Sequence, residues 1–236
     1  AQVKGFSGCK RTAFVLSSNS ATFRLRSLFT FMPQKYKVFL DKNWILFTDS
    51  APSSNESAQE IAQNELDEIL DIKALEVLFA QKGSLIIQVE EPMEALRLFF
   101  KNFKFVRTAG ALVKQVNADA YLWMRRFDHL DLPKGKIEKG ENELQAAFRE
   151  VQEETGLNGE LLLERELGQT YHVYEMKGKS YLKENHWFAL NYTGETNMTP
   201  QTEEGIESVF WLEESSWKSR LDECYEGLKE LLQSTC

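Results

Sequence analysis

The segment from Gly135 to Leu157, GKIEKGENELQAAFREVQEETGL, constrains this chain of 236 residues more than any other part of it. Glu150, Glu153 and Glu154 stand at i, i+3 and i+4, so on a helix all three carboxylates project from one face. Like charges at this spacing destabilise an isolated helix by about a few tenths of a kcal/mol per pair. A cluster of carboxylate oxygens is also the ligand set that Mg²⁺ or Mn²⁺ requires. The segment therefore predicts a helix that carries a divalent-cation site.

The alternative is a solvated surface helix, because runs of charged residues usually face water. The complete spacing favours the site. It reads glycine, five residues, Glu, seven residues, Arg-Glu, an aliphatic residue, one residue, Glu-Glu, one residue, glycine and an aliphatic residue. The positions that match are Gly135, Glu141, Arg149, Glu150, Val151, Glu153, Glu154, Gly156 and Leu157. This pattern resembles the Nudix box, and on it the chain is identified as a member of the Nudix hydrolase superfamily.

The resemblance implies an α/β fold, the Nudix α/β/α sandwich with a mixed sheet, in which the box forms a loop, a helix and a loop. It also implies an enzyme that uses water to cleave the phosphoanhydride of a nucleoside diphosphate linked to another moiety. Glu150, Glu153 and Glu154 would bind one or more divalent cations, Mg²⁺ or Mn²⁺. Arg149 would orient a catalytic glutamate, and Glu141 would support it. The general base would be one of the box glutamates or a glutamate in a later loop.

Elementary chemistry agrees with these roles. A pyrophosphate is polyanionic, so it repels nucleophilic water until cations neutralise its charge and acidify that water. Positioning and electrostatics then carry the rate, since little covalent work is left to the protein. Closely packed carboxylates should also retain protons more tightly, which suits a base that acts near neutral pH. Gly135 serves most simply as a turn position and Gly156 as the helix C-cap.

Four further residues are candidates for contacts with substrate or water. Arg125 and Lys134 precede or enter the box loop, where they either contact phosphate or solvate a strand end. Tyr174 stands at the distance beyond the box at which, by resemblance, members acting on dinucleoside polyphosphates carry a base-stacking tyrosine; the alternative is a tyrosine packed in the core. Glu204 lies in the polar loop 194–205 and is a candidate catalytic residue that contacts metal or water, although loop acids are ordinarily solvated.

These residues predict a hydrolase whose first-choice substrate is a dinucleoside polyphosphate. The sequence leaves two alternatives open: a house-cleaning nucleoside triphosphate pyrophosphatase, and a non-catalytic nucleotide-sensing module on the same fold. The retention of every box glutamate argues against the sensing module. A homodimer is left open as well.

The charge distribution bears on partners. The formal net charge is −8, yet residues 1–40 contain seven Lys or Arg and no acid, so the rest of the chain carries −15. We therefore expect a small nucleotide or polyphosphate as ligand, and neither nucleic acid nor a membrane as partner. The three cysteines, Cys9, Cys224 and Cys236, lack metal-binding or redox spacing, which favours unpaired thiols in a reducing cytoplasm.

Composition divides the chain into three parts. Residues 1–34 are rich in Ser and Arg and predict a disordered extension, either an organelle transit peptide or an over-extended reading frame before Met32; we favour the latter. Residues 35–104 predict a small α/β module of unknown role, and residues 105–236 the hydrolase domain. Within the module we expect a hairpin over 36–48, helices over 56–70 and 91–103, and a strand over 84–89, while 75–79 is ambiguous.

In the hydrolase domain, 109–115 and 120–126 predict paired strands around a turn. Beyond the box we expect a strand pair 161–166 and 168–176, a turn at 177–179, and a strand over 183–192. A strand over 206–212 and one amphipathic helix over 213–233 should end the chain.

Overall fold

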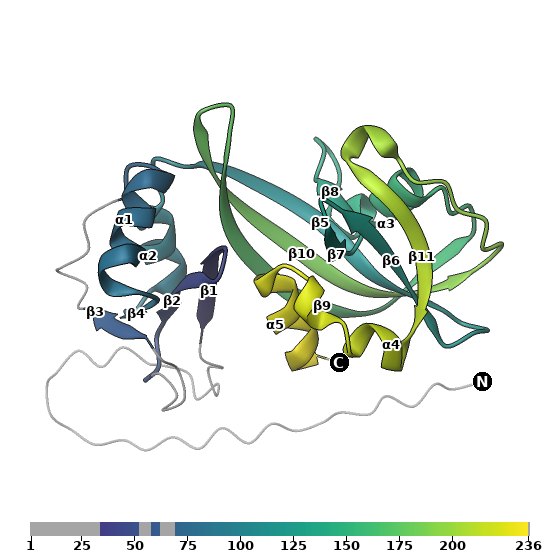
Figure 1. Ribbon diagram of the computed structural model, residues 1–236, viewed down its shortest axis with the longest axis horizontal. Helices are drawn as coiled ribbons and strands as arrows, with labels where there is room; N and C mark the ends of the chain where they lie inside the picture. Colours follow the sequence, from purple (N-terminus) through teal and green to yellow (C-terminus); the bar gives the residue numbers. More distant parts are fainter. Residues whose placement is uncertain (1–33, 52–57, 62–68, 236) are drawn as a thin grey trace, which may run out of the picture. The chain divides into compact units, whose positions relative to one another are not determined.

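Two long strands form the middle of a mixed sheet in the computed structural model, which describes residues 34–51, 58–61 and 69–235. They are β9 (Glu160–Met176) and β10 (Lys179–Thr193), antiparallel to each other and drawn in green in Figure 1. The strand order is β11-β6-β5-β10-β9-β1-β2-β4-β3, with β7 paired to β6 and β8 to β5. The other strands are β1 (Lys35–Leu40), β2 (Asn43–Thr48), β3 (Gln59–Ile61), β4 (Leu85–Gln88), β5 (Lys104–Gln115), β6 (Ala120–Arg126), β7 (His129–Asp131), β8 (Lys134–Lys136) and β11 (Ile206–Glu213).

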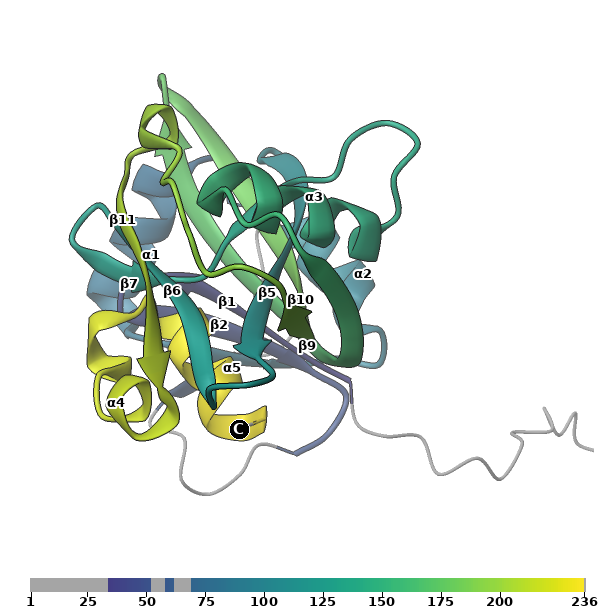
Figure 2. The same cartoon turned by 90° about the vertical axis from the view of Figure 1, so that its right-hand side faces the viewer.

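Helices cover both faces of this sheet. They are α1 (Ile72–Lys82), α2 (Pro92–Phe99), α3 (Glu143–Thr155), α4 (Glu214–Lys218) and α5 (Glu226–Thr235), with 3₁₀ turns η2 (Thr202–Glu204) and η3 (Leu221–Glu223). Figure 2 shows α3 on one side of β5 and β10, and α4 and α5 on the other. The predicted α/β fold with a mixed sheet is confirmed.

Alternation along β10 sorts the core into layers, because successive side chains of a strand point to opposite faces. Phe188 and Leu190 are buried with α3, and Leu182 on the same face is buried with α1 and α2. Trp187 and Ala189 point the other way, toward α4 and α5. Trp187 and Phe188, which are neighbours in the sequence, therefore lie on opposite faces of the sheet.

Residues 35–104 extend the sheet and add helices to it. The predicted hairpin is present as β1 and β2, and β1 also pairs in parallel with β9 through Val38 and Phe39. The strand predicted over 84–89 is β4, the helix predicted over 91–103 is α2 and ends at Phe99, and the ambiguous segment 75–79 lies within α1. The division into a module and a hydrolase domain remains a prediction.

Three predicted elements differ from the structure: the helix over 56–70, the strand pair within 161–176 and the C-terminal helix. The helix over 56–70 is wrong at Gln59–Ile61, which form β3; most of its remaining residues, like the extension before Gln34, lie outside the described ranges. The pair 161–166 and 168–176 is one strand, because Gly168 (φ +117°) sits at an irregularity in the pairing of β9 with β10 and does not reverse the chain.

The C-terminal helix is interrupted. It forms α4, η3 and α5, and Cys224 between η3 and α5 is extended (φ −84°, ψ 160°). The buried positions still include Trp217, Leu228 and Leu232, as the amphipathic pattern predicts. Among the described residues, no helix has the length and apolar character needed to cross a membrane.

Candidate active site

The helix that carries the box glutamates is α3, and its ends are well determined by sequence. Asn142 accepts a hydrogen bond from the Gln145 amide, and the Gln145 side chain accepts one from the Asn142 amide, which is a complete capping box. Gly156 closes the helix in the left-handed conformation (φ +72°). Val151 and the neighbouring alanines pack on the sheet, which leaves the face bearing Arg149 and the glutamates free for the site.

Glu154 is the most buried of the box carboxylates, with 2% of its side chain exposed. Its Oε2 accepts a hydrogen bond from the backbone N–H of Lys134 (2.7 Å), and its Oε1 lies 3.5 Å from Nη1 of Arg126. Burial raises the pKa of Glu154 to about 7, although the charges of Lys134 and Arg126 oppose this shift. A carboxyl group that exchanges a proton near neutral pH is suited to acid–base work.

Glu150 reaches over the strand that opens the box. A Cβ at Gly135 would lie 2.1 Å from the Glu150 carboxyl carbon, so any side chain there would displace this carboxylate. Burial is also the largest cause of the raised pKa of Glu150, ahead of repulsion from Glu153. The crowding of carboxylates, which we expected to raise these pKa values, contributes less than burial at both Glu150 and Glu154.

Arg149 organises the exposed side of the site. It binds both oxygens of Glu141 (2.7 and 3.0 Å), one oxygen each of Glu150 (2.7 Å) and Glu153 (2.8 Å), and the Lys136 carbonyl. These hydrogen bonds raise the pKa of Arg149 and, together with one from the Glu138 amide, lower the pKa of Glu141 to about 2. Arg149 thus connects the box loop to the helix, and it forms hydrogen bonds with two of the predicted metal ligands, Glu150 and Glu153.

The donors fit a divalent cation in their chemistry. Three carboxylates leave one helix within five positions, and burial holds Glu150 and Glu154 at raised pKa values that a cation would lower. In the described part of the chain no three acidic, His or Cys side chains already converge as a metal cluster. Cation binding would therefore redirect Glu150 or Glu153 away from Arg149.

Glu204 is brought to the site by a loop tied to the end of α3. The Thr199 amide donates to the Thr155 carbonyl (2.8 Å), and the Gln201 amide donates to the Glu154 carbonyl (3.1 Å). In this position Glu204 Oε2 lies 3.2 Å from Nη2 of Arg126. Arg126 therefore bridges a box glutamate and the loop glutamate.

The two basic candidates are differently placed. Arg125 points away from the box, donating to Glu223 (2.7 Å) and to the Asp128 carbonyl (3.0 Å). Lys134 is buried beside the box, where its ammonium group pairs with Asp131 and its amide binds Glu154. Of the two, only Lys134 contacts a box glutamate.

Tyr174 belongs to an aromatic and basic strip on β9 and β10, on the sheet face opposite α3. Its ring stacks on Tyr181 across the strand pair (centroids 5.1 Å apart, planes at 13°), and His172 lies 5.8 Å away. His172 is paired with Lys183. Burial and the charges of Lys183 and Lys134 lower the pKa of His172 to about 3.

Lys183 connects this strip to the box. Burial, together with repulsion from Lys134 and Arg126, lowers its pKa to about 7, and the charges of Asp131 and Glu154 act on it in the opposite direction. Within the described ranges the Lys183 ammonium has no hydrogen-bond or ion-pair partner. A partly buried cation without a partner is suited to bind an anionic ligand.

Sequence reasoning missed Arg126, Lys183 and His172. One signal was available: in the strand predicted over 183–192, Lys183 alternates onto the same face as the apolar residues Trp187 and Ala189, which marks it as a lysine pointing inward. Nothing in the sequence distinguishes Arg126 from Arg125, because the choice depends on which face of β6 meets the box.

Comparison with known proteins gives a consistent result. Residues 104–230 match the family model for the NUDIX domain. An RNA pyrophosphohydrolase of Bartonella quintana is 30% identical over 113 residues, 40% of this chain and 64% of that protein. The m7GpppN-mRNA hydrolase of Saccharomyces cerevisiae is 27% identical over 129 residues, 51% of this chain but only 12% of that protein. The chain thus spans less than two thirds of either relative.

The chain is also similar to solved structures. The chain is 24% identical to an Ap4A hydrolase of C. elegans, with 54% of this chain and 93% of that chain covered and a TM-score of 0.43. For a MutT protein from Methanosarcina mazei the identity is 16%, the coverage 56% and 94%, and the TM-score 0.43.

Proposed function

The chain belongs to the Nudix hydrolase superfamily, and from this premise we propose that it hydrolyses a phosphoanhydride bond and that its substrate is a dinucleoside polyphosphate. The observation that carries the proposal is the order of groups that begins at the carboxylates of α3 and continues through β8 to the strip on β9 and β10. Carboxylates come first (Glu150, Glu154), then cations (Lys134, Lys183), and then the stacked tyrosines headed by Tyr174. This order matches the parts of a nucleotide: a reacting phosphoanhydride, flanking phosphates and a base.

Each group has a defined task in this proposal. Glu150, Glu153 and Glu154 would hold a divalent cation, Mg²⁺ or Mn²⁺, which would neutralise charge and acidify water. Without the cation the pKa of Glu154 is about 7, so Glu154 can release a proton near neutral pH when the cation binds and lowers that pKa. The general base is then one of the box glutamates or Glu204. Arg149 holds the glutamates until ligands arrive. Glu204 stays near the site through Arg126.

The remaining side chains bind substrate. Lys183 and Lys134 contact phosphates that do not react. Arg126 takes the phosphate contact we had expected of Arg125, because Arg126 faces Glu154 whereas Arg125 is held by Glu223. Tyr174 stacks against a base with its free side, an interaction that contributes about 1–3 kcal/mol.

A substrate panel tests the proposal. Wild-type protein is incubated with Mg²⁺ or Mn²⁺ and either dinucleoside tetraphosphates or nucleoside triphosphates in ¹⁸O-water, and products are identified by mass. We expect faster turnover of the two-base compounds, and loss of turnover in Glu154→Gln. Equal or faster hydrolysis of nucleoside triphosphates would refute the two-base substrate and favour the house-cleaning pyrophosphatase.

A second candidate substrate is an RNA 5′ end, which the names of the two curated relatives favour. The charge of −15 outside the first 40 residues disfavours a long RNA. Adding a 5′-triphosphorylated and a capped oligonucleotide to the panel decides between these substrates.

A further inference from the structure

The turn between β6 and β7 carries a phenylalanine in an unusual place. Phe127 and Asp128 are its only two residues, and both have positive φ (49° and 62°). Two-residue hairpin turns of this kind favour Asn-Gly or Asp-Gly, and a bulky residue at positive φ is an outlier. Phe127 nevertheless leaves 63% of its surface exposed. It therefore adopts a costly backbone conformation without the compensation of burial.

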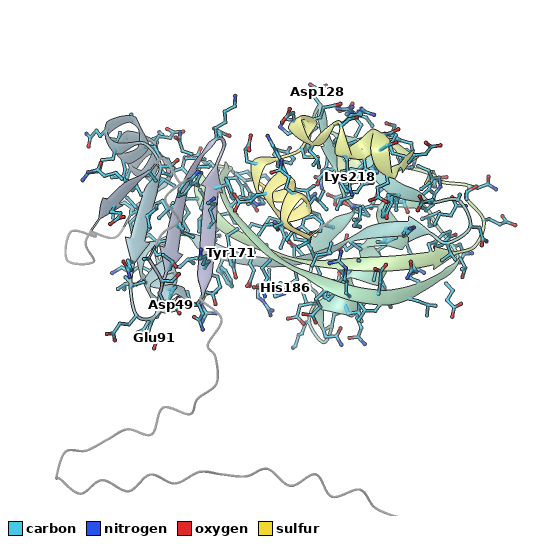
Figure 3. All side chains as sticks on the ribbon, turned by 90° about the horizontal axis from the view of Figure 1, so that it is seen from below. Asp49, Glu91, Asp128, Tyr171, His186 and Lys218 are labelled. Carbon is cyan, nitrogen blue, oxygen red and sulfur yellow. The ribbon has the colours of Figure 1, made fainter. Side chains whose placement is uncertain are left out.

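The surroundings of Phe127 hold its ring in position. A Cβ at Gly205 would lie 2.7 Å from Cζ of Phe127, so the ring packs directly on the Gly205 backbone, and the glycine is needed for this contact. The Arg126 guanidinium lies 5.6 Å from the ring centroid. Asp128 is fixed through its carbonyl, which accepts from Arg125 (3.0 Å). Figure 3 labels Asp128 at the surface of the molecule.

The ring also borders the active site. Arg126, the residue before Phe127, lies 3.5 Å from Glu154 and 3.2 Å from Glu204, and Gly205 directly follows Glu204. Of the two residues that position the ring, Arg126 belongs to the site and Gly205 is the neighbour of a site residue, Glu204. In the sheet order β5 and β10 lie between β6 and β9, so Phe127 and Tyr174 are on different sides of the basic groups.

We propose that Phe127 is a stacking platform for the second nucleobase of the substrate, the base across the cleaved phosphoanhydride from the one at Tyr174. The inference rests on the proposed function. The Phe127 ring contacts Gly205 through the atoms of its far edge, lies near the Arg126 guanidinium and stays largely exposed. Such a ring beside cations matches a planar, apolar base joined to a polyphosphate. A lone ring is too small for a protein-docking patch, which spans several hundred Å².

Binding measurements test this independently of turnover. Two ligands are used: a hydrolysis-resistant, methylene-bridged diadenosine tetraphosphate and the base-free methylenediphosphonate. Each is titrated into the protein in a calorimeter, with Mg²⁺ present throughout. We expect Phe127→Ala to weaken binding of the dinucleotide by about 5- to 100-fold and to leave binding of methylenediphosphonate within twofold. Phe127→Tyr should restore the affinity. Phe105→Ala, which removes another exposed phenylalanine (44%) on β5, should change neither.

Two further variants exclude a structural explanation. Phe127→Gly should weaken dinucleotide binding while the melting temperature stays level or rises, because glycine accepts positive φ without strain. In the double variant Phe127→Ala/Tyr174→Ala the two losses should add, since each ring holds a different base. If the double variant bound the dinucleotide as tightly as the single variant with the lower affinity, both rings would serve one base, and the inference would be overturned.

The outcomes separate the inference from the proposed function. An unchanged dissociation constant in Phe127→Ala, an equal loss for the base-free ligand, or no dinucleotide binding by wild type would each refute the role of Phe127. Hydrolysis of unmodified diadenosine tetraphosphate is followed in parallel. Tight, Phe127-dependent binding without turnover would refute the proposed reaction and leave the platform standing.

Discussion

Replacing Lys183 by methionine should stabilise the protein and weaken it as an enzyme. The Lys183 ammonium is partly buried, has no anionic partner among the described residues, and lies near the like charges of Lys134 and Arg126. Its pKa falls from 10.5 to about 7. Methionine keeps the length and apolar character of the side chain while removing the charge, so the repulsion and desolvation disappear.

The size of the gain follows from linkage. A fall of about 3.5 in pKa corresponds to about 5 kcal/mol between the two protonation states. Solvent that reaches the ammonium reduces this, and we expect Lys183→Met to raise the free energy of unfolding by about 2 kcal/mol at pH 7. The unfolded chain binds the proton more tightly than the folded one between pH 7 and 10.5. The loss of stability that the charged Lys183 causes in the wild type is therefore complete below pH 7 and disappears as the pH rises toward 10.5.

Urea denaturation at pH 7 and at pH 10 measures this, with Lys179→Met, an exposed lysine on the same strand, as the control. The stability gain of Lys183→Met should shrink at the higher pH. The same variant should raise KM for the polyphosphate substrate by about 10- to 100-fold, since it loses a charge-assisted hydrogen bond. A variant that is destabilised at pH 7, or whose KM is unchanged, would show that Lys183 is a structural lysine.

Five other variants probe separate parts of the site. Glu153→Gln and Glu154→Gln should each lower kcat by about 100-fold or more with the fold intact by circular dichroism; near-wild-type turnover in both would remove the box glutamates from the reaction. Tyr174→Ala should raise KM for dinucleoside polyphosphates and leave the metal requirement unchanged, as read from a Mg²⁺ titration of the rate. Gly135→Ala should lower kcat because its Cβ would displace Glu150; full activity would mean that the Glu150 position is not needed. His172→Gln should make stability less dependent on pH on the acid side. The pKa of His172 in the folded protein, about 3, lies below the ordinary 6.5, so the free energy of unfolding of the wild type falls by up to about 1.4 kcal/mol per pH unit as the pH drops below 6.5. An equal shift of the urea midpoint between pH 7.5 and pH 5 in the wild type and the variant would contradict this.

Local rules predicted the box helix because every signal there is local. The capping pair Asn142–Gln145, the apolar stripe through Val151 and the left-handed Gly156 all lie within one stretch of chain. The same rules failed at Gly168, since a glycine with positive φ can either reverse a chain or lie in a bulge, and only the partner strand decides which.

The chemistry of the site was harder to predict than its helix. Which carboxylate becomes the most buried depends on Lys134, whose amide meets Glu154 from 20 positions away in the chain. The choice of Arg126 over Arg125 depends on Glu223 and Glu204, which arrive from two other segments. Sequence spacing identifies the set of candidate side chains, and tertiary contacts assign each one its pKa and its partner.

A polar network that is buried at Tyr171 and Glu184 and partly exposed at Arg107 and Glu143 links the box to the N-terminal module. The Tyr171 hydroxyl donates to Glu184 (2.9 Å), Glu184 binds Arg107 (3.2 Å), and Arg107 pairs with Glu143, the first residue of α3. Tyr171 is also packed edge-to-face on Tyr36 of β1 (5.8 Å). Figure 3 shows Tyr171 where the N-terminal strands meet the long ribbon of β9 and β10.

This network bears on where the hydrolase domain can begin. Tyr171, Val173 and Leu182 lie on β9 and β10 but are buried against side chains of α1, α2 and β2. A chain starting near Val106 would expose these three side chains and leave Glu184, at present largely buried, open to water beside Arg107. Exposing that apolar surface would destabilise the strands that carry Tyr174 and Lys183, because burial of apolar area is the main stabilising term. The strands that carry the proposed substrate-binding residues therefore depend on residues 35–104 for their packing, even though the sequence motif that identifies the family lies entirely outside them.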